Sequence, residues 1–234
     1  MPIVWKFNFR QIGQGGYLRA WGLSPQKPVW RAYERSDVAI ARWLKREYPT
    51  IAWQARRDKA AISWSDEMGR CSDHVTGTSD ASVERTPVVQ ATGQRFGCNM
   101  TSAIINKGAL AFMVFEGQLT APVFVVFMQR LLKQVAGRIY LIMDGHPAHK
   151  SGKATRFVGN HSSRLRLIRM PDYGLELNPD EWLNQDVKTH GRGKSRLINW
   201  TERMAIVRSH VYRRQTQPQV ITNLFREKHV HYAA

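Results

Sequence analysis

The chain has 234 residues, of which 43% are hydrophobic, so it can bury a sizeable core as one domain with a small appendage. It contains no run approaching 18 apolar residues and no signal-peptide layout at its start, which excludes a membrane-spanning class and predicts a cytoplasmic protein. The formal net charge of +17 predicts a polyanionic partner, and nucleic acid is the first candidate.

The positive charge is concentrated at the two ends of the chain. Residues 1–60 hold 12 Lys and Arg against 4 Asp and Glu, and residues 185–234 hold 10 against 3. The centre, residues 61–184, holds 13 against 11 and contains the candidate catalytic acids. The basic flanks therefore indicate phosphate binding, with a merely solvated basic surface as the alternative.

The first predicted elements are helical. Residues 10–22 are predicted to form a short basic helix, which fits the second helix of a helix-turn-helix unit. Residues 29–48 are predicted to form a linker helix, with a start at Ser36 and a stop at Pro49. We therefore predict that residues 1–58 form an N-terminal DNA-binding segment with its linker.

The residue spacing changes after the linker helix. Short apolar bursts come first, and helices and strands then alternate. This order favours an α/β fold, a mixed sheet with helices on its faces, over residues 59–234. The predicted strands cover residues 61–65, 96–105, 109–115, 139–143 and 165–168, and the predicted helices cover 121–134, 150–160, 178–188 and a stripe from Trp200 to Val211.

Three acids stand where these elements begin or end. Asp66 and Asp144 each follow an apolar strand directly, and Glu181 lies in the first turn of a helix. Carboxyl ends of strands are where α/β sites form, and carboxylates are the ligands that Mg²⁺ prefers. The alternatives are a strand-ending turn for Asp66 and a capping box for Glu181. Glu67 competes with Asp66, because successive strand residues face opposite sides.

Five motifs carry a resemblance to a known family. Together they resemble the transposases of the mariner superfamily, in the bacterial group named after insertion sequence 630, over about residues 17–234. The motifs are GLSPQKP at 22–28, WSDEMG at 64–69, MDGHPAHK at 143–150, LNPDEWLNQDVK at 177–188 and VHYAA at 230–234.

The resemblance implies a ribonuclease-H-like fold, whose first and fourth strands lie side by side and bring Asp66 next to Asp144. It also implies an enzyme that cuts double-stranded DNA at transposon ends, joins the freed 3′ hydroxyl to target DNA, and acts as a homodimer on DNA in the bacterial nucleoid. Catalysis would use two Mg²⁺ ions, with Mn²⁺ as a substitute, held by Asp66, Asp144 and Glu181. Asp180 would then be a bystander.

Candidate DNA-binding residues come from both flanks and from the central motifs. His146 and His149 either contact phosphate or orient Asp144, and their spacing fits no paired-cysteine zinc pattern. The full predicted set is Arg19, Lys27, His146, His149, Lys150, Lys188, Arg192, Lys194 and Arg196.

The N-terminus departs from the family pattern. Of the two expected helix-turn-helix units, only the last helix of the second, Gly16 to Gly22, is recognisable, which predicts a truncated copy with an intact catalytic core. Two alternatives stay open. One is a catalytically inactive DNA-binding remnant that regulates transposition, and the other is a stand-alone nuclease of the same fold.

Overall fold

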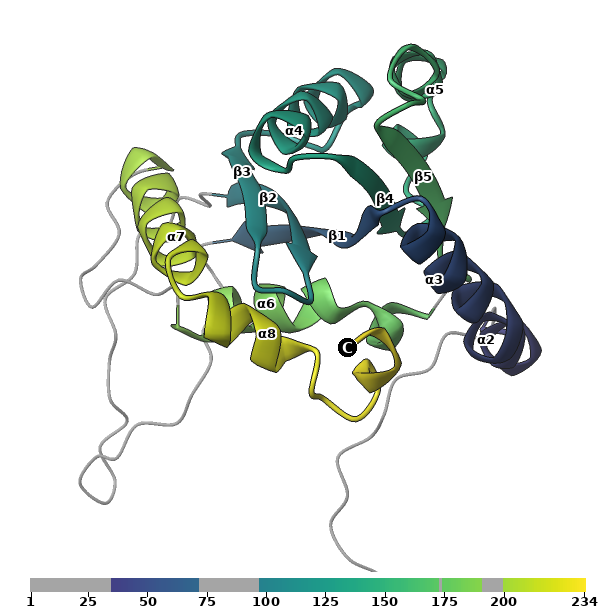
Figure 1. Cartoon of the computed structure of the whole chain (residues 1–234). Helices are drawn as coiled ribbons and strands as arrows, with labels where there is room; N and C mark the ends of the chain where they lie inside the picture. Colours follow the sequence, from purple (N-terminus) through teal and green to yellow (C-terminus); the bar gives the residue numbers. More distant parts are fainter. Residues whose placement is uncertain (1–34, 72–96, 173, 191–199) are drawn as a thin grey trace, which may run out of the picture. The chain divides into compact units, whose positions relative to one another are not determined.

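The computed structural model describes residues 35–71, 97–172, 174–190 and 200–234, which belong to one compact unit, Glu34–Ala234 (Figure 1). A five-stranded sheet with the order β3-β2-β1-β4-β5 forms its centre. The first three strands are antiparallel neighbours, whereas β4 is parallel to β1 and β5 is parallel to β4. The strands are β1 (Ala60–Cys71), β2 (Gly97–Ile105), β3 (Leu110–Phe115), β4 (Arg138–Met143) and β5 (Leu165–Arg169).

The predicted mixed sheet is confirmed, and the first and fourth strands lie side by side as expected, paired in parallel. The ladder between these two strands ends at the pair of Trp64 and Ile142, so Asp66 and Asp144 each lie two residues beyond its last pair. One predicted boundary is wrong, because β1 does not end before Asp66. The strand continues to Cys71 because β2 pairs with it over its whole second half.

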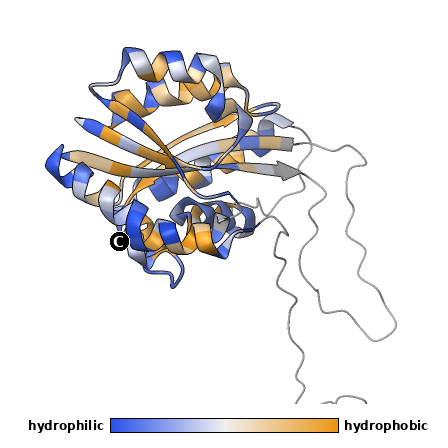
Figure 2. Ribbon diagram, turned by 90° about the vertical axis from the view of Figure 1, so that its right-hand side faces the viewer, coloured by the Kyte–Doolittle hydropathy of each residue, from blue (hydrophilic) through white to orange (hydrophobic). Residues whose placement is uncertain are grey.

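Helices cover both faces of the sheet (Figure 1). One face packs against α4 (Ala121–Gln134) and α5 (Gly152–Asn160). The other packs against α6 (Pro179–His190), α7 (Trp200–Gln215) and α8 (Pro218–Leu224). Figure 2 shows the apolar residues between these layers and the polar residues outside. Short helical turns lie at η2 (Pro147–Lys150), η3 (Leu175–Leu177) and η4 (His231–Ala233).

The helix before the sheet is longer than predicted. It begins at α2 (Asp37–Arg42), where Ser36 Oγ accepts from Ala39 N at 3.2 Å as expected, and continues through the π-helical η1 (Trp43–Glu47) into α3 (Tyr48–Arg57). The predicted stop at Pro49 is wrong. The hydrogen-bond register changes at the π turn, and Pro49 then occupies the first turn of α3, where a missing N–H is tolerated.

The C-terminal motif is structural. The Tyr232 ring packs edge-on against Tyr48 and Trp64, with ring centroids 4.8 and 5.7 Å apart. Its hydroxyl accepts from Trp43 Nε1 at 3.1 Å and donates to the Leu177 carbonyl oxygen at 2.9 Å. The end of the chain therefore joins α3 and β1 to the turn just before α6, which helps to position the start of that helix.

The other predicted helices are present with small shifts. Thr120 stands at the N-cap of α4, but its side chain accepts no hydrogen bond there. Ser151 caps α5 and accepts from Ala154 N at 3.2 Å. In α7, Val207 and Val211 of the predicted stripe are buried. None of the helices in the described part of the chain is long and apolar enough to cross a membrane.

Candidate active site

Asp66 lies on the face of the sheet that α6 covers. Its neighbours in strand alternation, Trp64 and Met68, belong to the same core as Leu183 of α6. The Asp66 side chain is 7% exposed, and its Oδ2 accepts a hydrogen bond from Asn184 Nδ2 at 2.9 Å. A carboxyl group is therefore held between the middle of β1 and the first half of α6.

The buried Asp66 carboxyl meets the partly exposed side chain of Glu181. Burial is the main cause that raises the pKa of Asp66 well above its usual range. A side-chain hydrogen bond with Glu181 and the negative charges of Glu181 and Asp180 raise it further. A hydrogen bond between two carboxyl groups requires a proton on one of them. The raised pKa of Asp66 shows that this position disfavours a second uncompensated negative charge, which a bound cation would compensate.

Asn178 fixes the start of α6 against the sheet. Its Nδ2 donates to the Ser65 carbonyl oxygen at 2.9 Å, and its Oδ1 accepts from Asp180 N at 3.1 Å. The expected helix start at this residue is confirmed, with Pro179 as the first helical residue. The capping-box alternative needs a bond from Asn178 N–H to Glu181, and no such bond appears among the described residues, where Glu181 meets Asp66 and Lys188 instead.

Asp180 is fully buried and points toward the sheet. Its Oδ2 accepts from Ser102 Oγ of β2 at 2.7 Å, and the backbone of Asp66 also hydrogen-bonds to it. Burial raises the pKa of Asp180 to about 8, although these hydrogen bonds oppose the shift. Asp180 is therefore part of the packing between α6, β1 and β2, and its expected lack of a role in metal binding stays a prediction.

Two oxygen atoms in this group are buried without a hydrogen-bond partner among the described residues. They are Oδ1 of Asp180 and Oδ1 of Asn184. Buried polar atoms are normally paired, so unpaired oxygens beside two hydrogen-bonded carboxyls favour an electropositive ligand at this place. The donor chemistry of the group, all oxygen and mostly carboxylate, fits a hard divalent cation.

Asp144 belongs to a different set of interactions. Its Oδ1 accepts from His146 N at 3.0 Å and lies 3.0 Å from His149 Nδ1. Burial alone would raise the pKa of Asp144, but the hydrogen bonds from His149 and from the His146 backbone outweigh it and lower the pKa. Asp144 is therefore held in its ionised form. His149 is 5% exposed and packs on Phe124, with ring centroids 4.4 Å apart.

Glu67 points to the same side as these histidines. Its Oε2 lies 3.7 Å from His146 Nε2, and burial is the main cause that raises its pKa, with Asp144 adding to the shift. The three predicted acids are thus separated: Asp66 contacts Glu181, whereas Asp144 lies beside His146, His149 and the additional acid Glu67. In the part of the chain that the structure describes, no three His, Cys, Asp or Glu side chains could hold one metal ion.

A cavity of about 430 Å³ separates the end of β4 from the start of α6. A Cβ at Gly145 would lie 2.7 Å from Asp172 Oδ1 and 3.3 Å from Lys150 Nζ. The glycine of the MDGHPAHK motif therefore lets these two side chains lie close to the backbone next to Asp144. The lining residues include Asp144, Gly145, Lys150, Asp172 and Asn178.

The predicted DNA-binding residues differ in location and in burial. Lys150 lines the cavity, and Lys188 Nζ lies 3.7 Å from Glu181 Oε1. The burial of His149 favours the alternative that it orients Asp144 over direct phosphate contact. His146 is partly exposed and lies between Glu67 and Asp144. Arg19, Lys27, Arg192, Lys194 and Arg196 lie outside the described residues.

Sequence reasoning missed the polar partners of the acids. Asn184 is three residues after Glu181, so both side chains lie on one helical face, and this spacing could have identified it. Ser102 and Asp180, which are joined by a hydrogen bond, are 78 residues apart, so no local sequence pattern could have paired them.

The fold and the acids between β1 and α6 define a ribonuclease-H-like protein. A family model described as "DDE superfamily endonuclease" matches residues 61–202, and the chain belongs to this superfamily. A winged helix-turn-helix model matches residues 10–47. This match contains the predicted helix at 16–22 and extends through η1. No curated protein matches the sequence.

Solved structures share the fold at low sequence identity. The Mos1 strand transfer complex is 11% identical, with a TM-score of 0.60 over 93% of this chain and 68% of that chain. The Mos1 mariner paired-end complex with Mg is 12% identical, with a TM-score of 0.60 over 93% and 69%. The catalytic domain of Mos1 mariner transposase is 10% identical, with a TM-score of 0.51 over 87% of this chain and 98% of that chain. The predicted fold class is confirmed.

Proposed function

We propose that this protein is a transposase of the insertion sequence 630 group, which cleaves DNA at the ends of its element and joins the 3′ ends to target DNA. The observation that carries the proposal is the contact of the buried Asp66 carboxyl with Glu181 at the start of α6, in a DDE superfamily domain. The five motifs and the winged helix-turn-helix match to residues 10–47 support a DNA substrate. The similar Mos1 structures, which include a strand transfer complex and a pre-cleavage transpososome, point in the same direction.

We propose that Asp66 and Glu181 would hold a divalent cation. Mos1 paired-end complexes are known with Mg and with Mn, and the oxygen donors here suit either ion. When bound, such an ion activates the attacking oxygen or stabilises the leaving oxygen of a phosphodiester. Asp144 is assigned as the third ligand on the motif alone, because its hydrogen bonds here are with His146 and His149.

The protein's own residues contribute orientation and charge. Asn184 fixes the Asp66 carboxyl by a hydrogen bond to Oδ2, and Asn178 fixes the start of the helix that carries Glu181. Lys150, at the edge of the cavity, places a positive charge where a phosphate could enter. His149 holds Asp144 ionised, which keeps a negative charge available at the end of β4.

The test is DNA cleavage and joining with Mg²⁺, using a duplex that ends in the terminal repeat flanking the coding sequence and a supercoiled target plasmid. Asp66→Asn, Asp144→Asn and Glu181→Gln should each lower cleavage by more than the roughly 10 to 100-fold that loss of an outer partner of a metal ligand costs. The control is Glu227→Gln, an exposed glutamate, which should cleave normally. Wild-type cleavage without joining would indicate a nuclease, and DNA binding without cleavage would indicate a regulator.

A further inference from the structure

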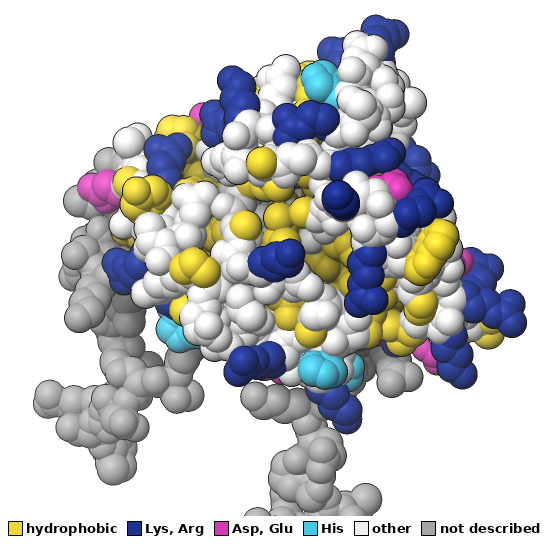
Figure 3. All heavy atoms as spheres, viewed as in Figure 1, with side chains coloured by type: hydrophobic (Ala, Val, Ile, Leu, Met, Phe, Trp, Pro, Cys, Tyr) yellow, Lys and Arg dark blue, Asp and Glu magenta, His cyan; other side chains and the backbone are white. Residues whose placement is uncertain are grey.

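The helix formed by α2, η1 and α3 has one buried face and one exposed face. Its buried face joins the core of the sheet through Ile40, Trp43, Ile51 and Ala55. At about 100° per residue, the residues of the opposite face fall within an arc of about 120°. These exposed residues are Lys45, Arg46, Pro49, Trp53, Arg56 and Arg57. Figure 3 shows Lys and Arg side chains gathered over α2, α3 and β5.

The acids of this helix are neutralised by other residues. Asp37 Oδ1 lies 3.0 Å from Arg35 Nε, and Glu47 Oε1 lies 2.7 Å from Arg42 Nε. Asp58, just after the helix, is paired with Arg57 and Arg138 at 3.1 and 2.9 Å.

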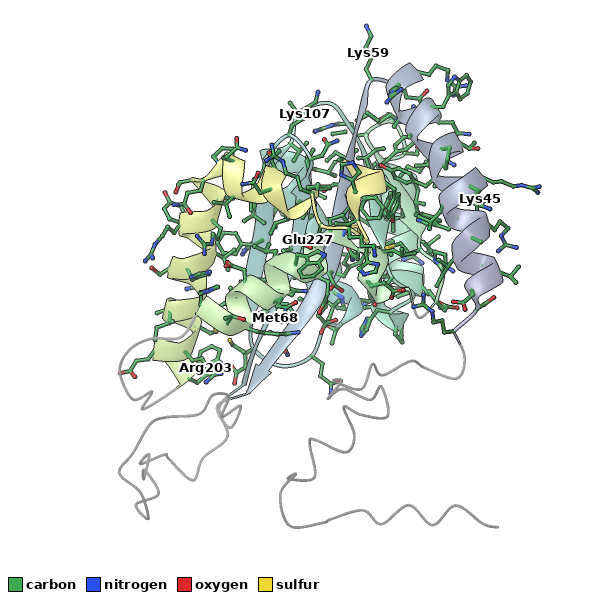
Figure 4. All side chains as sticks on the ribbon, turned by 90° about the horizontal axis from the view of Figure 1, so that it is seen from below. Lys45, Lys59, Met68, Lys107, Arg203 and Glu227 are labelled. Atoms are coloured by element: carbon green, nitrogen blue, oxygen red, sulfur yellow. The ribbon has the colours of Figure 1, made fainter. Side chains whose placement is uncertain are left out.

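The remaining cations of the face have no ion pair within the described residues. They are Lys45, Arg46 and Arg56. The exposed face therefore presents three uncompensated positive charges on a rigid helix, and Figure 4 shows Lys45 extending away from the protein.

Trp53 stands among these charges with 60% of its surface exposed. The Arg57 guanidinium lies over its ring, 5.2 Å from the centroid, so the ring is held in place on the helix. A large aromatic side chain left in water beside unpaired cations is typical of an interaction surface. Arg166 Nη1 donates to Gln54 Oε1 at 2.8 Å and thereby ties α3 to the edge strand β5.

We infer that this exposed face of η1 and α3, which we call the linker face, binds the backbone of double-stranded DNA. Lys45, Arg46 and Arg56 contact phosphates, and Trp53 packs against deoxyribose. Lys45 and Arg56 are separated by about 16 Å along the helix, which is roughly five phosphate steps of one strand. The inference rests on the proposed function, since that function supplies duplex DNA as the partner.

Two observations favour DNA over another partner. The charge of the linker face is complementary to phosphate and has no acid left to meet a basic protein. The winged helix-turn-helix match ends at residue 47, the last residue of η1, so it includes Lys45 and Arg46, and the rest of the linker face follows directly in sequence from a DNA-binding type of module. Interactions of this kind fix position on the duplex and carry no base information.

The experiment measures duplex binding by fluorescence anisotropy over a series of salt concentrations, with the full chain. The variant is the triple substitution Lys45→Gln, Arg46→Gln and Arg56→Gln. The slope of log affinity against log salt should become shallower by roughly 0.9 for each phosphate that the variant no longer binds, and affinity at low salt should fall at least tenfold. The matched control is Lys107→Gln, Lys133→Gln and Lys228→Gln, exposed lysines with the same change of net charge.

Lys107 lies in the turn between β2 and β3, at the opposite edge of the sheet from β5, and Figure 4 shows it well apart from Lys45. The control triple should leave the slope nearly unchanged. Equal effects of the two triples would show a response to net charge alone and would overturn the inference. An unchanged slope in the linker-face triple, with normal cleavage by the wild type, would overturn it and leave the proposed function standing.

Trp53 provides an independent measurement. Trp53→Ala should weaken duplex binding several-fold at every salt concentration without changing the slope, and Trp53→Phe should restore most of the affinity. The exposed position of Trp53 predicts an unchanged thermal unfolding temperature for both variants. A changed oligomeric state in sedimentation, with unchanged DNA binding, would make the face an interface between copies and overturn the inference. If the wild type itself bound no duplex, the proposed function would fail as well.

Discussion

The carboxyl group of Asp180, at the start of helix α6 (Pro179–His190), and that of Asp186, in its second half, have pKa values shifted in opposite directions. At its start, burial raises the pKa of Asp180 to about 8, and the pKa of Asp66, which Glu181 contacts, is raised too. Further along, burial also acts on Asp186, but the hydrogen bonds from His210 and Arg214 outweigh it and lower its pKa. The carboxyls of Asp180 and Asp66 are therefore difficult to ionise, whereas the charge of Asp186 is compensated by His210 and Arg214.

Asp186 holds α6 against α7. Asp186 accepts from His210 Nε2 at 2.8 Å and from both Nε and Nη2 of Arg214 at 2.8 and 2.9 Å. A two-pronged arginine interaction of this kind fixes geometry as well as charge. The Asp186 carboxylate is thus stabilised in its ionised form, whereas burial destabilises the ionised form of Asp180 in the first turn.

The largest stability effect is expected for Asp186→Asn. This change leaves Arg214 and His210 partly buried without their carboxylate and should lower the free energy of unfolding by about 2 kcal/mol, less than a fully buried pair would lose. The folded pKa of Asp186 is lowered, so its contribution is present above the unfolded pKa and is lost as pH falls through the folded value. Urea unfolding at neutral pH measures the loss.

A matched control for this variant is Asp37→Asn, whose ion pair with Arg35 is on the surface. It should change the free energy of unfolding by less than about 0.5 kcal/mol. Equal losses in the two variants would contradict a special role of Asp186 in holding α6.

Asp180→Asn should produce the opposite pH dependence. The folded pKa of about 8 lies above the ordinary value of 3.8, so the wild type loses stability as pH rises between these values. Asparagine has no proton to lose and still offers an oxygen to Ser102. The variant should therefore gain stability relative to the wild type as pH rises, with a plateau above about pH 8. A difference in the free energy of unfolding between the two proteins that does not vary with pH would contradict the raised pKa of Asp180.

The smallest effect is expected for Lys188→Gln. Its ammonium lies 3.7 Å from Glu181 Oε1, but the side chains are 47% and 38% exposed. Such a pair contributes less than about 0.5 kcal/mol to stability. If Lys188 contacts DNA as predicted, the salt slope of duplex binding should fall by roughly one unit. A loss of stability comparable to that of Asp186→Asn would show that the first half of α6 is also held by ion pairs.

Local sequence patterns predicted most of the fold. The apolar bursts located all five strands, and Asn178 with Pro179 located the start of α6, because both signals depend on residues within one turn or strand. The stop at Pro49 was wrong, since sequence spacing does not reveal a change of helical register in η1.

The site was predicted only in part, because local sequence patterns do not reveal which distant segments pack together. Strand alternation indicated that Asp66 and Glu67 face opposite sides, but the partners on each side come from distant segments. His210 and Arg214 lie 24 and 28 residues from Asp186, and Ser102 lies 78 residues from Asp180. The raised pKa of Asp66 and the split between the groups of Asp66 and Asp144 depend on burial, which only the packed structure provides.

The central claim is that the hydrogen-bonded pair of Asp66 and Glu181 is where a divalent cation binds. Isothermal titration calorimetry with Mn²⁺, in two buffers of different ionisation enthalpy, tests it most directly. Because the pKa of Asp66 is raised, binding of a cation to its carboxylate should release a proton and become tighter as pH rises. Asp66→Asn and Glu181→Gln should lose the binding, and Asp37→Asn should retain it. Unchanged Mn²⁺ affinity in both site variants, or binding without proton release, would contradict the claim.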